Sequence, residues 1–207
     1  MNLNTKHILY RQTCDEGEFL TLSEKPDFPL AQVHQTHSAD VIEVGENKAY
    51  SEADGMIDQS KSCVLAIKTA DCLPIYLASQ KGNILVHAGW RGLASEILAH
   101  PKIIEAKPYF ALIGPCIHRE QFEVSADFCE NFATNKFMSS DGGRHRFDLV
   151  ALAKTQLTQL FQDVRVQESG HCTFLGRQFH SYRRNKTVKR NWNIFLPSRI
   201  LAQVNNL

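Results

Sequence analysis

The chain has 207 residues, which is enough for one domain with a sizeable apolar core. Hydrophobic residues make up 43% of it and charged residues 22%, a composition typical of a globular protein rather than a disordered or membrane-spanning one. The net charge of +1 at pH 7 excludes a strong overall attraction to nucleic acid or to an anionic membrane surface.

Short apolar runs and helical spacings predict a series of strands and helices. In chain order we expect strands at 64–67, 73–78 and 84–87, a helix at 93–100, a strand at 110–113, helices at 125–132 and 149–161, and a strand at 193–196. Asp148 is the expected N-cap of the helix at 149–161. Because strands and helices do not alternate regularly, we expect a mixed, layered α/β fold in a single domain, residues 1–207, rather than a barrel or a doubly wound sheet.

We expect no targeting signal in this sequence. The first seven residues lack an apolar signal core, and no apolar run approaches the roughly 20 residues that span a bilayer. The six cysteines, at 14, 63, 72, 116, 129 and 172, form no CxxC pair and are expected to be free thiols. We therefore expect a cytoplasmic protein.

Three residues are candidate metal ligands. His34 ends the sequence Gln-Val-His, Cys72 lies between two strand-like runs, and His87 ends a third. Two imidazoles and one thiolate, with a fourth position left for water, form the ligand set of a catalytic zinc site. Zinc lowers the pKa of such a water to roughly 7, which provides a nucleophile at neutral pH.

Cys72 has a second interpretation. It could instead act as a thiolate nucleophile with His87 as its base, although a thiolate bound to zinc has its electron pair committed. Asp71 and Asp54 are candidates for orienting the ligand histidines or for acid–base catalysis, and water-facing turn carboxylates are the alternative.

Arg91 follows His87 in the sequence His-Ala-Gly-Trp-Arg-Gly, at an expected helix start. A cation is unfavourable at a helix N-terminus unless an anion binds between it and the backbone N–H groups, so we expect Arg91 to bind an anion, with an exposed charge at the helix start as the alternative. Tyr182, Arg183 and Arg184 could form a substrate or anion rim, or a solvated basic face. Cys116 could simply pack in the core.

Several motifs in fixed order resemble the bacterial YfiH family, also called the laccase-domain or polyphenol oxidoreductase family. They are QVH (32–34), ADG (53–55), TADCLPI (69–75), HAGWRG (87–92), IGPCI (113–117), FEVS (122–125), CT (172–173) and SYRR (181–184). The resemblance implies a fold of the YfiH-like cysteine hydrolase type, with zinc bound by His34, Cys72 and His87.

The same resemblance implies phosphorolysis of purine nucleosides (adenosine, inosine, guanosine and methylthioadenosine), with adenosine deamination as a second reaction. Cys72, His87, Asp71 and Arg91 are the expected catalytic residues, and Arg91, Arg183 and Tyr182 the expected substrate contacts. A second role implied by the family is peptidoglycan editing, as an amidase acting on UDP-MurNAc-serine. A zinc-binding module without activity is a weaker alternative. We expect small-molecule substrates, no nucleic acid or membrane partner, and a monomer.

The chain departs from the family pattern in two places. Gln35 stands where the family usually has glycine, and His37 follows as a competing ligand, although one face of a strand would not present both His34 and His37. The region before residue 31 is shorter than expected and has no clear counterpart of the family's Asn-Arg segment.

Copper oxidation is the least favoured chemistry. A trinuclear copper cluster needs many histidines, usually in His-x-His pairs, and none of the nine histidines forms such a pair. The three methionines do not have the spacing of a blue-copper axial ligand. Since copper exceeds zinc in raw affinity for such ligands, we expect any copper to be adventitious.

Overall fold

A computed structural model describes residues 5–45 and 51–204. A five-stranded sheet has the order β1-β2-β14-β6-β3. Its strands are β1 (Ile8–Cys14), β2 (Gly17–Leu22), β14 (Asn191–Pro197), β6 (Leu65–Thr69) and β3 (Ala31–Gln32). Neighbouring strands pair antiparallel except β3 and β6, which are parallel.

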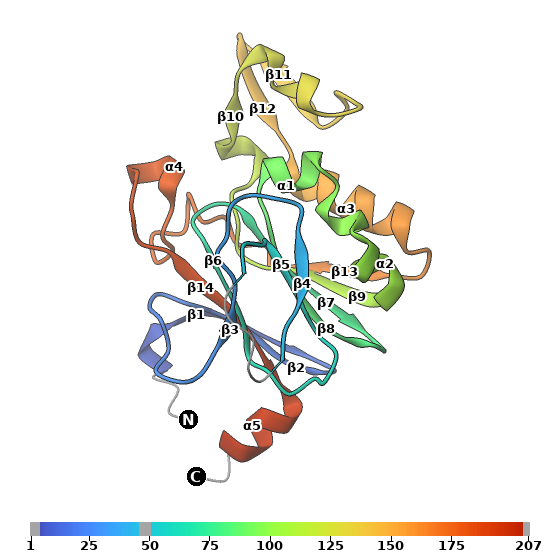
Figure 1. Cartoon of the computed structure of the whole chain (residues 1–207). Coiled ribbons are helices and arrows are strands. Elements are labelled where there is room, and N and C mark those ends of the chain that lie inside the picture. Colours follow the sequence, from blue (N-terminus) through green and yellow to red (C-terminus); the bar gives the residue numbers. More distant parts are fainter. Residues whose placement is uncertain (1–4, 46–50, 205–207) are drawn as a thin grey trace.

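A six-stranded sheet has the order β13-β9-β7-β8-β5-β4. Its strands are β13 (Arg165–Glu168), β9 (Pro108–Ile113), β7 (Leu73–Ser79), β8 (Gly82–Ala88), β5 (Gly55–Asp58) and β4 (Val41–Glu43). A small three-stranded sheet, β10-β12-β11, projects from one end of the molecule (Figure 1). It comprises β10 (Glu123–Val124), β12 (Arg144–Phe147) and β11 (Met138–Asp141).

The helices are short, apart from one. They are α1 (Trp90–Ala94), α2 (Pro101–Ala106), α3 (Leu149–Leu160), α4 (Tyr182–Asn185) and α5 (Ser198–Val204). Four 3-10 turns complete the elements: η1 (Thr5–His7), η2 (Ile97–Ala99), η3 (Arg119–Gln121) and η4 (Ala126–Asn131). Among the described helices, none is long and apolar enough to cross a membrane.

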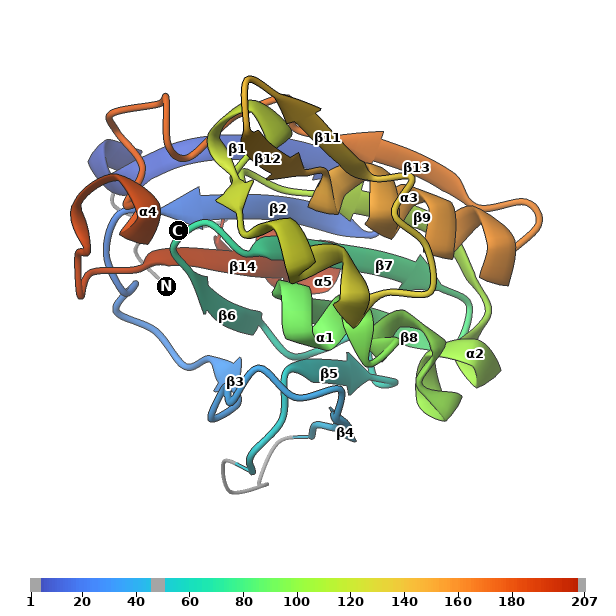
Figure 2. The ribbon, with the colours of Figure 1, turned by 90° about the horizontal axis from the view of Figure 1, so that it is seen from above.

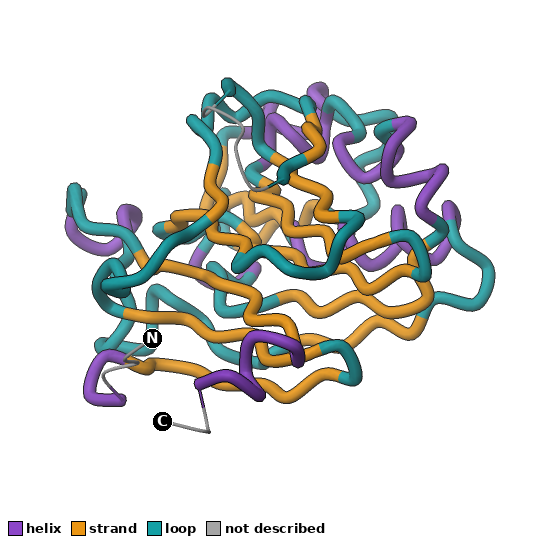
Figure 3. Tube along the Cα trace, turned by 60° about the horizontal axis from the view of Figure 1, so that its bottom comes forward, coloured by secondary structure: helices purple, strands orange, loops and turns teal. Residues whose placement is uncertain are grey.

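The layers follow from the alternation of side chains along the strands. In β7, Ile75 and Leu77 face a core shared with α1, α2 and α3, while Tyr76 faces a second core between the two large sheets, where its ring stacks on Phe195 at 3.8 Å. In β14, Ile194 faces the opposite way, into a third core under α5. Figure 3 shows the C-terminal helix on one side of the strands and most other helices on the opposite side. Strands buried on both faces explain the continuous apolar runs in the sequence.

Each strand that the sequence predicted is present, with bounds within two residues: β6, β7, β8, β9 and β14. The long helix is α3, and Asp148 caps it by accepting a hydrogen bond from the Ala151 N–H at 2.8 Å. The predicted helix at 93–100 is wrong, because Glu96 has a left-handed φ of 55° that ends α1 and separates it from η2. The segment at 125–132 forms the 3-10 turn η4 rather than an α-helix.

Two chain connections place the functional site. The β3–β4 connection and the β6–β7 connection both pass from the five-stranded sheet to the six-stranded sheet. The first carries His37 and the second carries Cys72, while His87 lies near the end of β8. The fold thus brings together three segments that are distant in the sequence. Figure 2 shows the strands β3, β4, β6, β7 and β8 that these segments adjoin.

Candidate functional site

His37, Cys72 and His87 form a compact group. One ligand atom from each residue lies within 4.8 Å of the other two. The Cys72 Sγ is 4.0 Å from His37 Nε2, and the two imidazole rings meet edge to face, with centroids 4.8 Å apart. His87 is buried and His37 is exposed, so the group opens to solvent on the His37 side.

A fully buried carboxylate, Asp54, connects two parts of this group. Its Oδ1 is 2.6 Å from His87 Nδ1, which leaves Nε2 as the free ring nitrogen of His87. Its Oδ2 accepts hydrogen bonds from the backbone N–H groups of Thr36 at 3.1 Å and Ser38 at 2.6 Å. Asp54 therefore orients the ring of His87 and also fixes the backbone on both sides of His37. A hydrogen-bonded partner of this kind sets the tautomer of a metal-binding histidine.

Two residues of the site have left-handed backbone conformations, which are uncommon outside glycine. His37 has φ of 62°, between the two N–H groups held by Asp54. Asp71, next to Cys72, has φ of 95° and is held by hydrogen bonds from Thr173 Oγ1 at 2.8 Å and from the Arg183 N–H at 2.6 Å. Hydrogen bonds from elsewhere in the fold thus impose both turns that present the ligand atoms.

Gly89 allows the chain after His87 to approach the group closely. A Cβ at this position would lie 3.2 Å from the Cys72 sulfur and 3.1 Å from the His37 ring. The first glycine of the His-Ala-Gly-Trp-Arg-Gly sequence therefore has a packing role beside the ligand atoms.

The three groups shift one another's proton affinity. Burial raises the pKa of the Cys72 thiol, but hydrogen bonds and charge from His37 and His87 outweigh it and lower that pKa to about 6. Burial lowers the pKa of His87, yet Asp54 and Cys72 together raise it to about 9. Burial raises the pKa of Asp54, whereas its bonds to His87, Ser38 and Thr36 lower it to about 2. In the metal-free protein at neutral pH, these shifts favour a thiolate on Cys72 beside an imidazolium on His87.

Alkylation of Cys72 in the metal-free protein is expected to have a midpoint near pH 6, because only the thiolate reacts with iodoacetamide. Cys14 is the internal control, since burial raises its pKa to about 11 and it should react only in strongly alkaline solution. The measurement is the alkylation rate of each cysteine from pH 5 to 10 by peptide mass spectrometry. A midpoint for Cys72 near the ordinary value of 9 would contradict the proposed thiolate.

His34, the expected first ligand, lies outside the group. It is exposed and forms a β-bridge with Glu52, and the histidine gathered with Cys72 and His87 is His37. The objection that one strand face cannot present both histidines does not apply, because β3 ends at Gln32 and His37 lies in a turn. The pattern Gln-x-His occurs twice in succession, at 32–34 and 35–37, and this repeat is the sequence signal that pointed to two alternatives.

The expected orienting role belongs to Asp54 rather than Asp71. The side-chain oxygens of Asp71 accept bonds from Thr173 and Arg183, so Asp71 holds the Cys72 turn instead of a histidine. Arg91 is exposed and stacks on the Trp90 ring at 4.7 Å. Its helix, α1, has only five residues, so the helix dipole adds little to any anion site at Arg91.

The segment from Cys172 to Asn185 divides into structural and exposed residues. Arg184 donates to the backbone carbonyls of Thr173 at 2.9 Å and Phe179 at 2.5 Å, which fixes the loop. Tyr182 is 50% exposed, with the Lys186 ammonium 4.7 Å from its ring centroid.

Cys116 is buried, and burial raises the pKa of its thiol well above 9, so it packs in the core.

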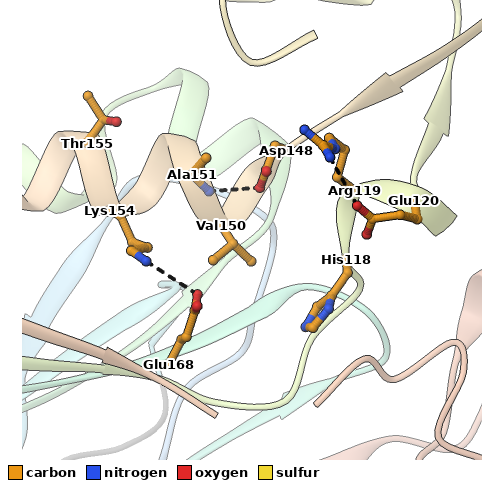
Figure 4. Close-up of a pocket in the computed structure, with 9 residues that line it drawn as sticks. All are labelled: His118, Arg119, Glu120, Asp148, Val150, Ala151, Lys154, Thr155 and Glu168. Atoms are coloured by element: carbon orange, nitrogen blue, oxygen red, sulfur yellow. Dashed lines mark hydrogen bonds and ion pairs between the residues drawn. The ribbon is translucent and has the colours of Figure 1, made fainter. Parts of the chain in front are cut away.

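Two open hollows lie on the surface around η3. One, of about 430 Å³, lies between α3 and η3, where Lys154 pairs with Glu168 and Asp148 is engaged in capping α3 (Figure 4). The other, of about 610 Å³, lies between the three-stranded sheet and α4 and includes Arg183. The charged groups of the first hollow are largely paired with one another, and its outline includes none of the three residues of the compact group.

Comparison with known proteins gives consistent matches. The profile of the family described as multi-copper polyphenol oxidoreductase laccase matches residues 18–195. Purine nucleoside phosphorylase RP494 of Rickettsia prowazekii is 33% identical over 177 residues, which cover 76% of this chain and 74% of that protein. Purine nucleoside phosphorylase YfiH of Escherichia coli is 31% identical over 170 residues, covering 76% of this chain and 70% of its relative.

Solved structures share the fold. Neisseria meningitidis protein NMB0706 superposes with a TM-score of 0.77 at 25% identity, covering 93% of this chain and all of the other. YlmD of Geobacillus stearothermophilus gives a TM-score of 0.68 at 24% identity, covering 80% of this chain and 73% of the other. The expected mixed α/β fold is therefore confirmed.

Proposed function

Since the chain belongs to the laccase-domain family, which includes the YfiH proteins, we propose that it is a zinc-dependent purine nucleoside phosphorylase. Its substrates would be adenosine, inosine, guanosine and methylthioadenosine, with adenosine deamination as a second activity. A cytoplasmic location belongs to this proposal and suits a sequence whose six cysteines form no CxxC pair.

The observation that carries this proposal is the group of His37, Cys72 and His87 with its buried partner Asp54. Two imidazole nitrogens and a thiolate suit zinc, and three protein ligands leave one coordination position for a water or substrate. Tetrahedral zinc–nitrogen and zinc–sulfur bonds place nitrogen and sulfur about 3.5 Å apart. The 4.0 Å between Cys72 Sγ and His37 Nε2 is close to that separation. A zinc ion held by these residues would supply a polarised water with a pKa near 7.

The protein's own residues would position the reacting groups. Asp54 holds the Nδ1 proton of His87, so Nε2 is directed to the ligand group. Asp71 keeps Cys72 in place through its bonds to Thr173 and Arg183. Exposed Arg91 and Tyr182 remain the proposed contacts for phosphate and nucleoside, together with Arg183.

Incubation of zinc-loaded protein with adenosine and phosphate is expected to release adenine and ribose 1-phosphate. A chelator should abolish this turnover and zinc should restore it. Inosine formed without phosphate would support deamination. Elemental analysis of protein purified without added metal should find about one zinc per chain, and copper in its place would support the oxidoreductase chemistry instead. No nucleoside turnover by zinc-loaded protein would overturn the proposal.

One observation favours a second function, the cysteine hydrolase. The site also contains the three groups of a cysteine hydrolase: Cys72 as the nucleophile, His87 as the base and Asp54 as the carboxylate that orients the base. The lowered pKa of the Cys72 thiol suits a nucleophile. In this role the protein would be an amidase acting on UDP-MurNAc-serine, as the family resemblance implies.

Sensitivity to chelator and alkylation separates the two functions. The amidase should release serine in the presence of a chelator and lose activity when Cys72 is alkylated. The phosphorylase should lose activity in the chelator before any alkylation. Serine release that depends on added zinc would exclude the cysteine mechanism.

A further inference from the structure

We propose that the hollow between the three-stranded sheet and α4 is a phosphate-binding subsite formed by Arg144, Arg146 and Arg183. This inference rests on the proposed phosphorylase function and names the residues that would hold its co-substrate. The hollow has a volume of about 610 Å³, and all three arginines line it. In Figure 1, the three-stranded sheet lies at the top of the molecule and α4 below it at the left.

The arginines of β12 face the hollow because of strand alternation. Arg144 and Arg146 are two residues apart in β12, so they share one face of that strand. His145 between them is engaged separately, with its Nδ1 2.7 Å from Ser140 Oγ. Within the described residues, neither Arg144 nor Arg146 forms an ion pair with a carboxylate. Two guanidinium groups are therefore available at the same wall of the hollow.

Arg183 completes the cluster from the opposite wall and is held in place. Its guanidinium donates to the Glu123 carbonyl at 2.6 Å and lies 5.1 Å from the Phe122 ring centroid. Its backbone N–H donates to Asp71, the residue before Cys72. The hollow is thus connected through one residue to the turn that presents the Cys72 thiolate.

The charge balance of the hollow favours an anion. Two carboxylates also line it, but Glu120 pairs with Arg119 at 3.2 Å. The second carboxylate, Glu123, lies opposite Arg146 in the strand pairing. One carboxylate cannot balance three arginines, so the hollow keeps an excess of positive charge. Planar guanidinium groups bind phosphate oxygens in pairs of hydrogen bonds, and several of them together match a doubly charged phosphate. Phe174 and Val124 also line the hollow, and its volume of about 610 Å³ leaves room for the sugar of ribose 1-phosphate beside the phosphate.

Inorganic phosphate is the probe for the first test, by isothermal titration calorimetry on the zinc-loaded chain at low ionic strength. The double variant Arg144→Gln/Arg146→Gln should bind phosphate at least tenfold more weakly than the wild type. Arg165→Gln is the matched control, because Arg165 is exposed in β13 and lines neither hollow, and the phosphate affinity of this variant should equal that of the wild type. Arg144→Glu, at an exposed position, should weaken phosphate binding further without affecting the fold, which the thermal unfolding midpoint checks. Wild-type affinity in the double variant would overturn the subsite.

Kinetics distinguish this inference from the proposed function. In phosphorolysis, the KM for phosphate should rise at least tenfold in the double variant, while the KM for the nucleoside stays unchanged. A double variant that is active and has an unchanged KM for phosphate would overturn the subsite without contradicting the phosphorylase function. Arginine-dependent phosphate binding without nucleoside turnover would support the subsite and remove the phosphorylase function.

Discussion

Replacing His37 with alanine is expected to remove the bound metal and nearly all turnover, whereas His34→Ala should leave both close to the wild type. Of these two histidines, only His37 lies close to Cys72 and His87 in the described structure. Loss of a residue that merely supports a ligand typically costs roughly 10–100-fold in metal affinity. Loss of one of three ligands should therefore cost more than 100-fold.

Zinc content after dialysis and competition with a metal-binding dye measure this difference. The two histidines are both exposed and three residues apart, so each variant controls for the other's effect on folding. Metal loss in His34→Ala with retention in His37→Ala would contradict the ligand group. Zinc content and activity equal to those of the wild type in both variants would exclude the proposed metal site.

Replacing Asp54 with asparagine is expected to weaken metal binding by roughly 10–100-fold and to destabilise the protein. The neutral amide accepts weaker hydrogen bonds from the Thr36 and Ser38 N–H groups than the carboxylate does. It also no longer balances the positive charge of His87. The pKa of Asp54 is about 2 rather than 3.8, which corresponds to roughly 2 kcal/mol of stability at neutral pH. Activity should fall because both the His37 turn and the His87 ring lose their support.

The destabilisation should depend on pH in a defined way. The lowered pKa of Asp54 means that its contribution is present above about pH 3.8 and is lost as the pH falls through about 2. The raised pKa of His87 means that its contribution is complete below about pH 6.5 and is lost as the pH rises through about 9. In metal-free protein, the wild type should exceed Asp54→Asn in stability most between about pH 4 and 6.5.

Urea unfolding across this pH range, with a chelator present, measures the free-energy difference. Asp58→Asn is the matched control, since Asp58 is also fully buried and accepts from the Ser62 and Cys63 N–H groups at the far end of β5. It should lose stability without losing metal affinity. A stability difference for Asp54→Asn that stays constant from pH 4 to 10 would show that the Asp54–His87 pair is not charged.

Apolar runs determine much of the layered architecture from the sequence alone. The runs at 64–67, 73–78 and 84–87 predict β6, β7 and β8 because strands covered on both faces need apolar side chains at every position. By contrast, β1, β10, β12 and β13 have mixed patterns with partly exposed residues. Their strand character comes from pairing with a neighbour, so the local sequence predicts them poorly.

The sequence by itself proposed Cys72 and His87 as site residues, each as a metal ligand or as part of a nucleophile–base pair, since those residue types carry the chemistry. Only the tertiary structure favours His37 over His34 as the proposed ligand, because the sequence places both histidines after Gln-x. The decision rests on Asp54, which lies 17 residues beyond His37 in the chain and fixes the left-handed turn at His37 through two backbone hydrogen bonds. A side chain in the β3–β4 connection cannot be placed by periodicity, because its direction is imposed by a buried carboxylate from another segment.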